Sequence, residues 1–213
     1  MKITIIYDND PVEAGLKTGW GFSALIKVRK TPLILFDTGN DGASLLYNME
    51  RLGIDPVQIG IIVISHTHGD HTGGLLDILE LNSYAMVYLP SIISYDTAGR
   101  DVITVRQPTQ ISEDVISTGE LKGIEQALLI KTDKGIVVVT GCSHPGVAEI
   151  LDVALHYGKV YGIIGGLHGF RDFDRLDGLS LICPCHCTQY KPEIRILFPQ
   201  QYVACGTGLT LEI

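Results

Sequence analysis

Three histidines and one aspartate are crowded into a short segment in the first half of the chain. Residues 65–72 read Ser-His-Thr-His-Gly-Asp-His-Thr and follow the apolar run Ile-Ile-Val-Ile of residues 61–64. Neutral imidazole nitrogens and carboxylate oxygens are typical ligands of zinc, iron and manganese. Packing alone does not account for this cluster, because crowded imidazoles repel one another when protonated and gain little when neutral. The segment therefore predicts a metal site at the end of a buried strand.

The spacing of these four side chains predicts where they point. If residues 66–70 stay extended, His66, His68 and Asp70 project to one side, because side chains alternate along a strand. A turn at Gly69 would let His71 join them from another direction. One metal ion cannot easily use all four side chains and still keep an open coordination position. Two neighbouring metal ions are therefore expected.

A fifth candidate ligand follows a second apolar strand. The strand Val137–Thr140 ends in Gly-Cys-Ser-His-Pro-Gly at residues 141–146. His144 lies between this strand end and a helix start, where it could complete a metal site; the alternative is a packed histidine held by the Pro-Gly turn. Cys142 faces the same way as His144 if the backbone is extended. It is either a thiolate ligand or a small buried hydrophobe.

A sixth candidate lies in the cysteine-rich run at residues 183–187, which reads Cys-Pro-Cys-His-Cys. In an extended chain the three cysteines share one face and His186 takes the other. The spacing is also not the C-x2-C pattern of a structural zinc site. We therefore assign His186 to the metal site and expect the cysteines in the core or around the ligands.

Two further polar residues have a functional and a structural interpretation. Asp37 ends an apolar strand, where its carboxylate either holds a ligand histidine or forms an ordinary turn with the following Thr-Gly. His168 lies in the glycine-rich segment 165–169, where it could donate a proton to a leaving group. The alternative is a solvated loop residue.

The elements that must position these residues follow from the apolar pattern. Strand 61–65 is apolar on both faces, as expected of a strand covered by layers on each side. Residues 72–81 have the spacing of a helix, and residues 127–140 form a hairpin around Asp-Lys-Gly. Residues 91–118 show no sustained period and predict loop with short strands. Two sheets packed together with helices outside is the simplest layered solution.

Composition restricts the class of protein. The 213 residues are 46% hydrophobic and 19% charged, which is typical of a compact globular domain, and we expect one domain over residues 1–213. A net charge of −8 does not favour nucleic acid as a partner. No apolar run is long enough for a membrane span, and no signal-peptide pattern is present. Five cysteines, an odd number, do not indicate the disulfide framework of a secreted protein, so we expect a cytoplasmic location.

Several of these motifs together resemble a known family. The Phe-Asp-Thr-Gly of residues 36–39, the His-Thr-His-Gly-Asp-His of residues 66–71 and the late His186 resemble the metallo-β-lactamase superfamily. The segments 141–146, 165–168 and 185–188 are similar to its archaeal and bacterial branch that includes the dihydropterin ribofuranosylaminobenzene phosphate synthase of methanopterin biosynthesis. This resemblance implies an α+β fold, a four-layer αββα sandwich, with a dinuclear metal site at one edge.

The resemblance also implies a division of the ligands. It assigns His66, His68 and His144 to one metal and Asp70, His71 and His186 to the other. The chain departs from the superfamily at two places. A separate histidine commonly precedes the hairpin, whereas Glu125 and Gln126 are found there in this chain. A bridging aspartate is also common near the position of Cys142, whereas residues 142–144 of this chain read Cys-Ser-His.

The expected activity is that of a dinuclear metal-dependent hydrolase. Two divalent ions, zinc or alternatively iron or manganese, would lower the pKa of a bridging water from about 15.7 toward 7. Asp70 would orient the nucleophile, and His168 could donate to the leaving group. A helix starting at Thr72 would add a positive dipole end, which favours a small anionic ester or phosphoester as substrate.

Two alternative functions use the same residues. In the first, the protein is a transferase that joins a pterin diphosphate to an aromatic amine. In the second, the protein is a non-catalytic metal-binding module. Turnover of a generic phosphodiester without an amine would favour the hydrolase over the transferase. Full metal occupancy without any turnover would favour the metal-binding module.

Overall fold

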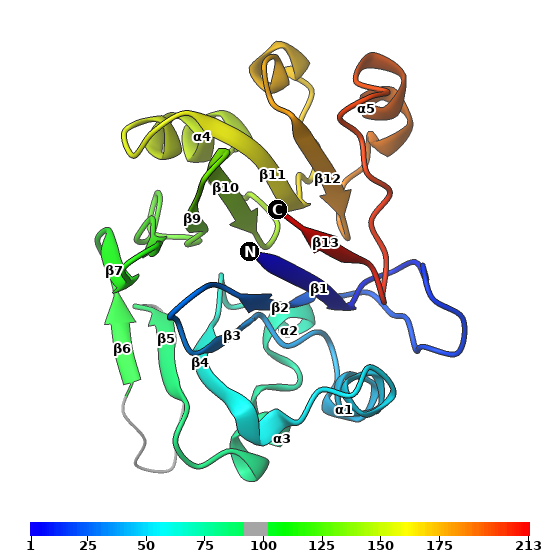
Figure 1. The fold of residues 1–213 in the computed structure, drawn as a ribbon, viewed down its shortest axis with the longest axis vertical. Helices are drawn as coiled ribbons and strands as arrows, with labels where there is room; N and C mark the ends of the chain where they lie inside the picture. The colour runs from blue at the N-terminus through cyan, green and yellow to red at the C-terminus, as the bar shows by residue number, and fades with distance from the viewer. Residues whose placement is uncertain (92–101) are drawn as a thin grey trace.

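The computed structural model describes residues 1–91 and 102–213 of the chain. Two β-sheets lie face to face, and helices cover the outer side of each sheet (Figure 1). The strands of the first sheet are β1 (Lys2–Tyr7), β2 (Ser23–Lys27), β3 (Leu33–Phe36), β4 (Ile59–Val63), β5 (Met86–Pro90), β6 (Val102–Val105) and β13 (Thr210–Glu212). Their order across the sheet is β13-β1-β2-β3-β4-β5-β6.

The second sheet is built from the later part of the chain. Its strands are β7 (Thr109–Ser112), β8 (Val115–Ser117), β9 (Leu128–Thr132), β10 (Gly135–Thr140), β11 (Val160–Gly166) and β12 (Leu181–Cys185). They lie in the order β12-β11-β10-β9-β8-β7, with β10, β11 and β12 parallel. The parallel arrangement brings the ends of these three strands to one edge of the sheet.

Helices form the two outer layers. The first sheet is covered by α1 (Gly42–Arg51) and α3 (Leu75–Leu81), preceded by the short α2 (Gly69–Thr72). The second sheet is covered by α4 (Val147–Leu155) and α5 (Lys191–Leu197), and short 3-10 turns occur at Pro56–Gln58 and Phe173–Leu176. Among the described residues, no helix is long and apolar enough to cross a membrane.

Alternating side chains build three apolar layers between these elements. In β10, Val137 and Val139 enter the core between the two sheets, whereas Ile136 and Val138 pack in the outer core that includes α4. A third core joins the outer face of the first sheet to α1 and α3, with Leu45 and Leu75 fully buried. This arrangement confirms the expected α+β, four-layer αββα sandwich.

The structure corrects the helix expected at residues 72–81. That segment contains the end of α2, a break at Gly73 and Gly74, and then α3. A Cβ atom at Gly73 would clash with the carbonyl group of Asn40, because the chain passes close to that loop. The short strands expected within 91–118 are present as β6, β7 and β8, while residues 92–101 lie outside the described part of the chain.

One close approach between strands gives a testable prediction. Gly165 pairs with Thr140 across β11 and β10, has a φ of +130°, and leaves no room for a Cβ atom beside the Thr140 carbonyl oxygen. Gly165→Ala should lower the free energy of unfolding by about 2 kcal/mol or more. Gly146→Ala is the control, since Gly146 also has a large positive φ, +111°, but open space around it, and this variant should lose at least about 1 kcal/mol less than Gly165→Ala. Equal losses in urea unfolding of both variants would contradict the steric explanation.

Candidate metal centre

The histidine-rich segment changes conformation in its middle. His68 itself is extended, with φ of −65° and ψ of 142°, and α2 begins at Gly69 because the amides of His71 and Thr72 donate to the carbonyl oxygen of His68. The expectation of an extended chain through Asp70 is therefore wrong. As a consequence, the Asp70 side chain does not lie with those of His66 and His68, and it is directed toward His71 and His186 instead.

The first group of donor atoms consists of His66, His68 and His144, whose ligand atoms lie within 4.8 Å of one another. Nε2 of His66 is 3.1 Å from Nδ1 of His68, and the ring of His144 is 4.7 Å from that of His66. Nε2 of His144 is buried and has no hydrogen-bond partner among the described residues. A buried polar atom without a partner costs free energy, so a cation at this point would compensate for it.

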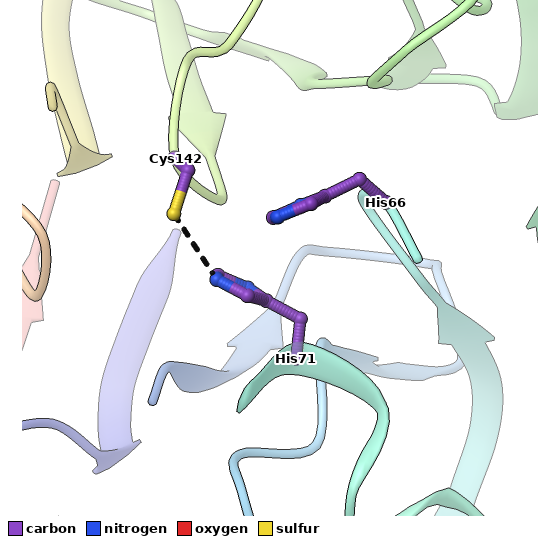
Figure 2. Close-up of side chains that lie close together, drawn as sticks. All are labelled: His66, His71 and Cys142. Carbon is purple, nitrogen blue, oxygen red and sulfur yellow. Dashed lines mark hydrogen bonds between the residues drawn. The ribbon is translucent and has the colours of Figure 1, made fainter. Parts of the chain in front are cut away.

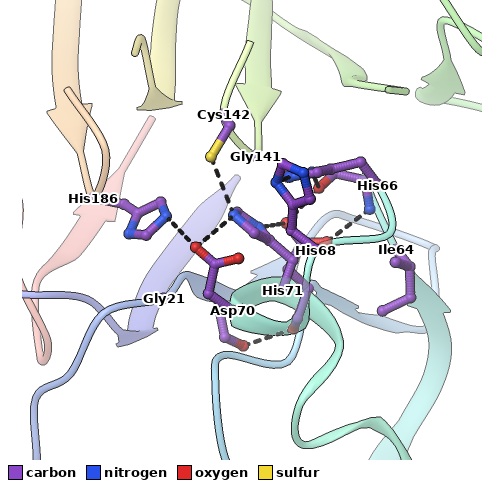
Figure 3. A network of polar contacts seen from close by, with 12 residues as sticks. Gly21, Ile64, His66, His68, Asp70, His71, Gly141, Cys142 and His186 are labelled. Carbon is purple, nitrogen blue, oxygen red and sulfur yellow. Dashed lines mark hydrogen bonds and ion pairs between the residues drawn. The ribbon is translucent and has the colours of Figure 1, made fainter. Parts of the chain in front are cut away.

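The second group consists of Asp70, His71 and His186, again within 4.8 Å of one another. Oδ2 of Asp70 is 3.2 Å from Nε2 of His186 and 3.9 Å from Nε2 of His71 (Figure 3). Nε2 of His186 is also buried, and it faces the Asp70 carboxylate without completing a hydrogen bond to it. The structure thus brings the six residues singled out in the sequence into two adjacent triads, and metal binding by these triads stays a prediction.

His186 reaches the second group through a backbone turn at the end of β12. The strand ends at Cys185 because the backbone of His186 turns into the left-handed region, with a φ of +44°. The amide of His186 donates to the buried carboxylate of Asp8 at 2.9 Å. Its Nδ1 lies 2.9 Å from Oδ1 of Asn9, which leaves Nε2 directed at the cluster. Asp8 and Asn9 were not predicted as site residues, because their only signal in the sequence is a position just after the first strand.

The same turn corrects the expected arrangement of the cysteines. Cys183 and Cys185 enter the core between the sheets, but Cys187 follows the left-handed His186 and lies against Cys142 instead. The three cysteines therefore do not share a face. Cys185 is joined to Cys205 by a disulfide with a Cα–Cα distance of 5.1 Å, a bond that sequence analysis did not foresee. The two cysteines come from separate segments that meet only in the folded core.

Two histidines are oriented by polar partners behind them. Nδ1 of His71 is 2.7 Å from the carboxylate of Asp37, which confirms that this aspartate holds a candidate ligand. Nδ1 of His66 is 2.9 Å from the hydroxyl of Ser65, which itself donates to Asp37. Partners on Nδ1 fix the tautomer that leaves the Nε2 lone pair free for a metal.

Burial sets the protonation of this network. Burial and the nearby His186 lower the pKa of His71 to about 3, so its imidazole is neutral at physiological pH. Burial raises the pKa of Asp37 to about 7 despite its bonds to Ser65. For Asp70, burial acts to raise the pKa, but His186 and His71 outweigh it and lower the pKa below its usual range. Neutral imidazoles beside an ionised carboxylate are the forms that bind divalent metals.

Glu125 holds the loop that carries His144. Its carboxylate accepts hydrogen bonds from the amides of four successive residues, Gly141, Cys142, Ser143 and His144, at 2.9 to 3.1 Å. Burial acts to raise its pKa, yet His66 and these amides together lower the pKa. The sequence showed a glutamate before the hairpin but gave no indication that it anchors the loop.

Three further residues lie around the triads. His168 is exposed, has a φ of +47°, and places its ring 5.2 Å from that of His144 without joining a donor group. Trp20, which sequence analysis did not assign to the site, is 59% exposed with its ring 4.8 Å from that of His186. Cys142 places its sulfur 3.2 Å from Nε2 of His71 (Figure 2).

Comparison with known proteins places this chain in a family. The profile of the metallo-β-lactamase superfamily matches residues 19–126, a segment that contains the histidine-rich motif. The chain therefore belongs to the metallo-β-lactamase superfamily. Its fold and its clustered His, Asp and Cys side chains, which could hold a metal ion, agree with that assignment.

Individual relatives extend over most of the chain. It is 29% identical to the 7,8-dihydropterin-6-methyl-4-(beta-D-ribofuranosyl)-aminobenzene-5'-phosphate synthase of Methanocaldococcus jannaschii, over 81% of this chain and 82% of that protein. An uncharacterised protein of the same organism is 26% identical over 91% of this chain and 93% of its own length. The crystal structure of Tm1679, a metal-dependent hydrolase of the β-lactamase superfamily, superposes with a TM-score of 0.84 and 27% identity, covering 100% of this chain and 99% of that one.

The Glu125 anchor gives a prediction about stability. Glu125→Gln replaces one carboxylate oxygen by an amide group that cannot accept from the His144 amide. The metal-free variant should lose about 2–4 kcal/mol of unfolding free energy, since the His144 amide is left without an acceptor and the three hydrogen bonds to Oε1 lose their charged acceptor. Glu80→Gln, at an exposed position on α3, should stay within about 0.5 kcal/mol of the parent protein. Urea unfolding measures both, and a loss below about 1 kcal/mol for Glu125→Gln would count against the anchor.

Proposed function

We propose that this protein is a dinuclear metal-dependent hydrolase acting on a small anionic ester or phosphoester. The observation that supports it most is the pair of adjacent triads, His66-His68-His144 and Asp70-His71-His186, each with a buried Nε2 atom lacking a hydrogen bond. Divalent cations held there would lower the pKa of water enough to supply hydroxide at neutral pH and would polarise the bond to be broken. We expect zinc, with iron or manganese as alternatives.

The charge of the donor set supports an anionic substrate. Five of the six donors are imidazoles, which add no charge when neutral, and only Asp70 adds a negative one. Most of the charge of two divalent cations would therefore remain uncompensated and attract an anion. The helix dipole expected at Thr72 does not contribute as proposed, since α2 begins at Gly69 and has only four residues.

Two side chains have proposed roles in the reaction. Asp70 keeps an ionised carboxylate between His71 and His186, from which it could accept a hydrogen bond from the attacking water or hydroxide and orient it. His168 is exposed at the rim beside His144 and could give a proton to the leaving oxygen. In hydrolysis of a phosphoester the water oxygen bonds to phosphorus, the ester oxygen leaves, and that oxygen takes the proton.

A transferase reaction is the second candidate, and two observations favour it. The synthase of Methanocaldococcus jannaschii covers most of the chain, and Trp20 exposes an indole beside His186. An exposed aromatic face can stack on a planar ring of a substrate such as a pterin. In that reaction an aromatic amine would form a C–N bond, diphosphate would leave as the C–O bond breaks, and the amine would lose a proton.

Metal content gives the first prediction for this proposal. His68→Ala removes one donor of the first triad, so the affinity of that site should fall at least about 10–100-fold and the metal content from about two to about one equivalent. Hydrolytic activity should fall with it. His156→Ala, at the exposed end of α4, is the control and should keep both. Unchanged metal stoichiometry in His68→Ala, measured by elemental analysis, would contradict the assignment.

A second prediction separates the candidate reactions. The zinc-loaded protein should hydrolyse bis(p-nitrophenyl) phosphate without any added amine, at a rate that Asp70→Asn lowers by about 10²-fold or more. Strict dependence of turnover on an aromatic amine, tested with a pterin diphosphate, would favour transfer instead. Full metal occupancy without turnover on esters, phosphoesters or the pterin pair would favour a metal-binding module.

A further inference from the structure

Cys142 lies between the two triads and belongs to neither. Its Sγ atom forms one group with the ligand atoms of His66 and His71, and a second group with those of His186 and Cys187, each within 4.8 Å. We propose that the Cys142 thiolate is a seventh ligand, shared between the two metal ions. This inference rests on the dinuclear centre proposed above and names the group that connects its two halves.

The contact with His71 shows that the sulfur faces a lone pair. Nδ1 of His71 is held by the Asp37 carboxylate at 2.7 Å, so the proton of the neutral ring is on that side. Its Nε2 is therefore an acceptor, 3.2 Å from the sulfur of Cys142 (Figure 2). In the metal-free protein, the Cys142 thiol can donate its proton to Nε2 of His71. With metal, that proton goes to solvent and both atoms become donors to a cation.

A second observation points to a ligand on the other side of the sulfur. His186 is 3% exposed, and its Nε2 lies 3.2 Å from the Asp70 carboxylate without a hydrogen bond, in the same group of donor atoms as the sulfur of Cys142. Figure 3 shows the side chains of His186, Asp70, His71 and Cys142 arranged around one space. His66 of the first triad, and His71 and His186 of the second, thus have donor atoms within 4.8 Å of the sulfur, as a shared ligand requires.

The backbone holds the sulfur in this position. The amide of Cys142 donates to Glu125 at 2.9 Å, and the amides of its two neighbours donate to the same carboxylate. The side chain is 3% exposed, so it has little freedom to turn toward solvent. Among the donor groups of the described residues, Asp70 is the only carboxylate. No second carboxylate is therefore available to connect the two triads, and the thiolate takes that place.

A shared thiolate has chemical consequences for this centre. It adds a second negative charge to the ligand set, which lowers the net charge of the loaded site. A soft sulfur ligand also favours zinc or iron over manganese and magnesium, which prefer oxygen ligands. Metal preference is thus set by Cys142 in addition to the histidines.

X-ray absorption of the zinc-loaded protein tests the proposal directly. A thiolate shared by both ions gives about one sulfur neighbour per zinc, at about 2.3 Å, beside nitrogen and oxygen neighbours at about 2.0–2.2 Å. Cys142→Ser and Cys142→Asp should both lose this sulfur shell, and Cys142→Asp should keep about two zinc ions because a carboxylate can also be shared. About half a sulfur per zinc would mean a ligand of one ion only and would overturn the sharing.

Two further variants control for the other thiols. Cys183→Ser and Cys187→Ser should keep the sulfur shell, because Cys183 lies in the core with the disulfide and Cys187 groups with His186 but not with His66 or His71. A shell that survives in both Cys142 variants and disappears in Cys187→Ser would overturn the assignment to Cys142. Two bound zinc ions with no sulfur neighbour would overturn this inference alone. Absence of zinc binding would overturn the proposed centre and this inference with it.

Discussion

The candidate metal centre depends on buried carboxylates that bind backbone amides of its loops. Glu125 accepts from the loop 141–144, Asp37 accepts from the amide of Ser65, and Asp8 accepts from the amide of His186. Each carboxylate is at most 1% exposed, so its charge would be costly without these donors. The loops must therefore keep the conformation that satisfies the charges, and that conformation directs the donor side chains to one region.

The sandwich explains why three distant segments can meet there. Residues after β4 come from the first sheet, and residues after β10 and β12 come from the second, and the core between the sheets brings these strand ends together. The apolar layers position the strands, while the carboxylates position the last few residues of each loop. Positive φ values at Asp37, Ser143 and His186 mark the places where loops turn sharply to reach the cluster. Such turns are retained because the surrounding hydrogen bonds hold them.

Chemistry at this edge follows from the kinds of donor that it gathers. Neutral imidazoles provide lone pairs, Asp70 provides one negative charge, and Cys142 adds sulfur at the point between the two triads. The edge also carries Trp20, an exposed aromatic group that the ligand set does not use. Membership in the superfamily fixes the fold and the general kind of site, but not the reaction, because one fold supports several chemistries. The two candidate reactions differ in the nucleophile and in the atom attacked, since water would attack phosphorus in hydrolysis and an amine would attack carbon in transfer.

Sequence alone predicted the layered fold and the cluster of His66, His68, Asp70 and His71, because strand periodicity and clustered His and Asp are local signals. His144 and His186 were named from their positions at strand ends, and metal binding by all six residues stays a prediction. The conformation of residues 66–70 was not evident from the sequence: α2 begins at Gly69, and the residue after it, Gly73, packs against the backbone of Asn40. Only the tertiary structure showed the anchoring by Glu125, the Cys185–Cys205 bond and the place of Cys142 between the triads. Those contacts join segments that are distant in the chain, and no short-range pattern records which of them will meet.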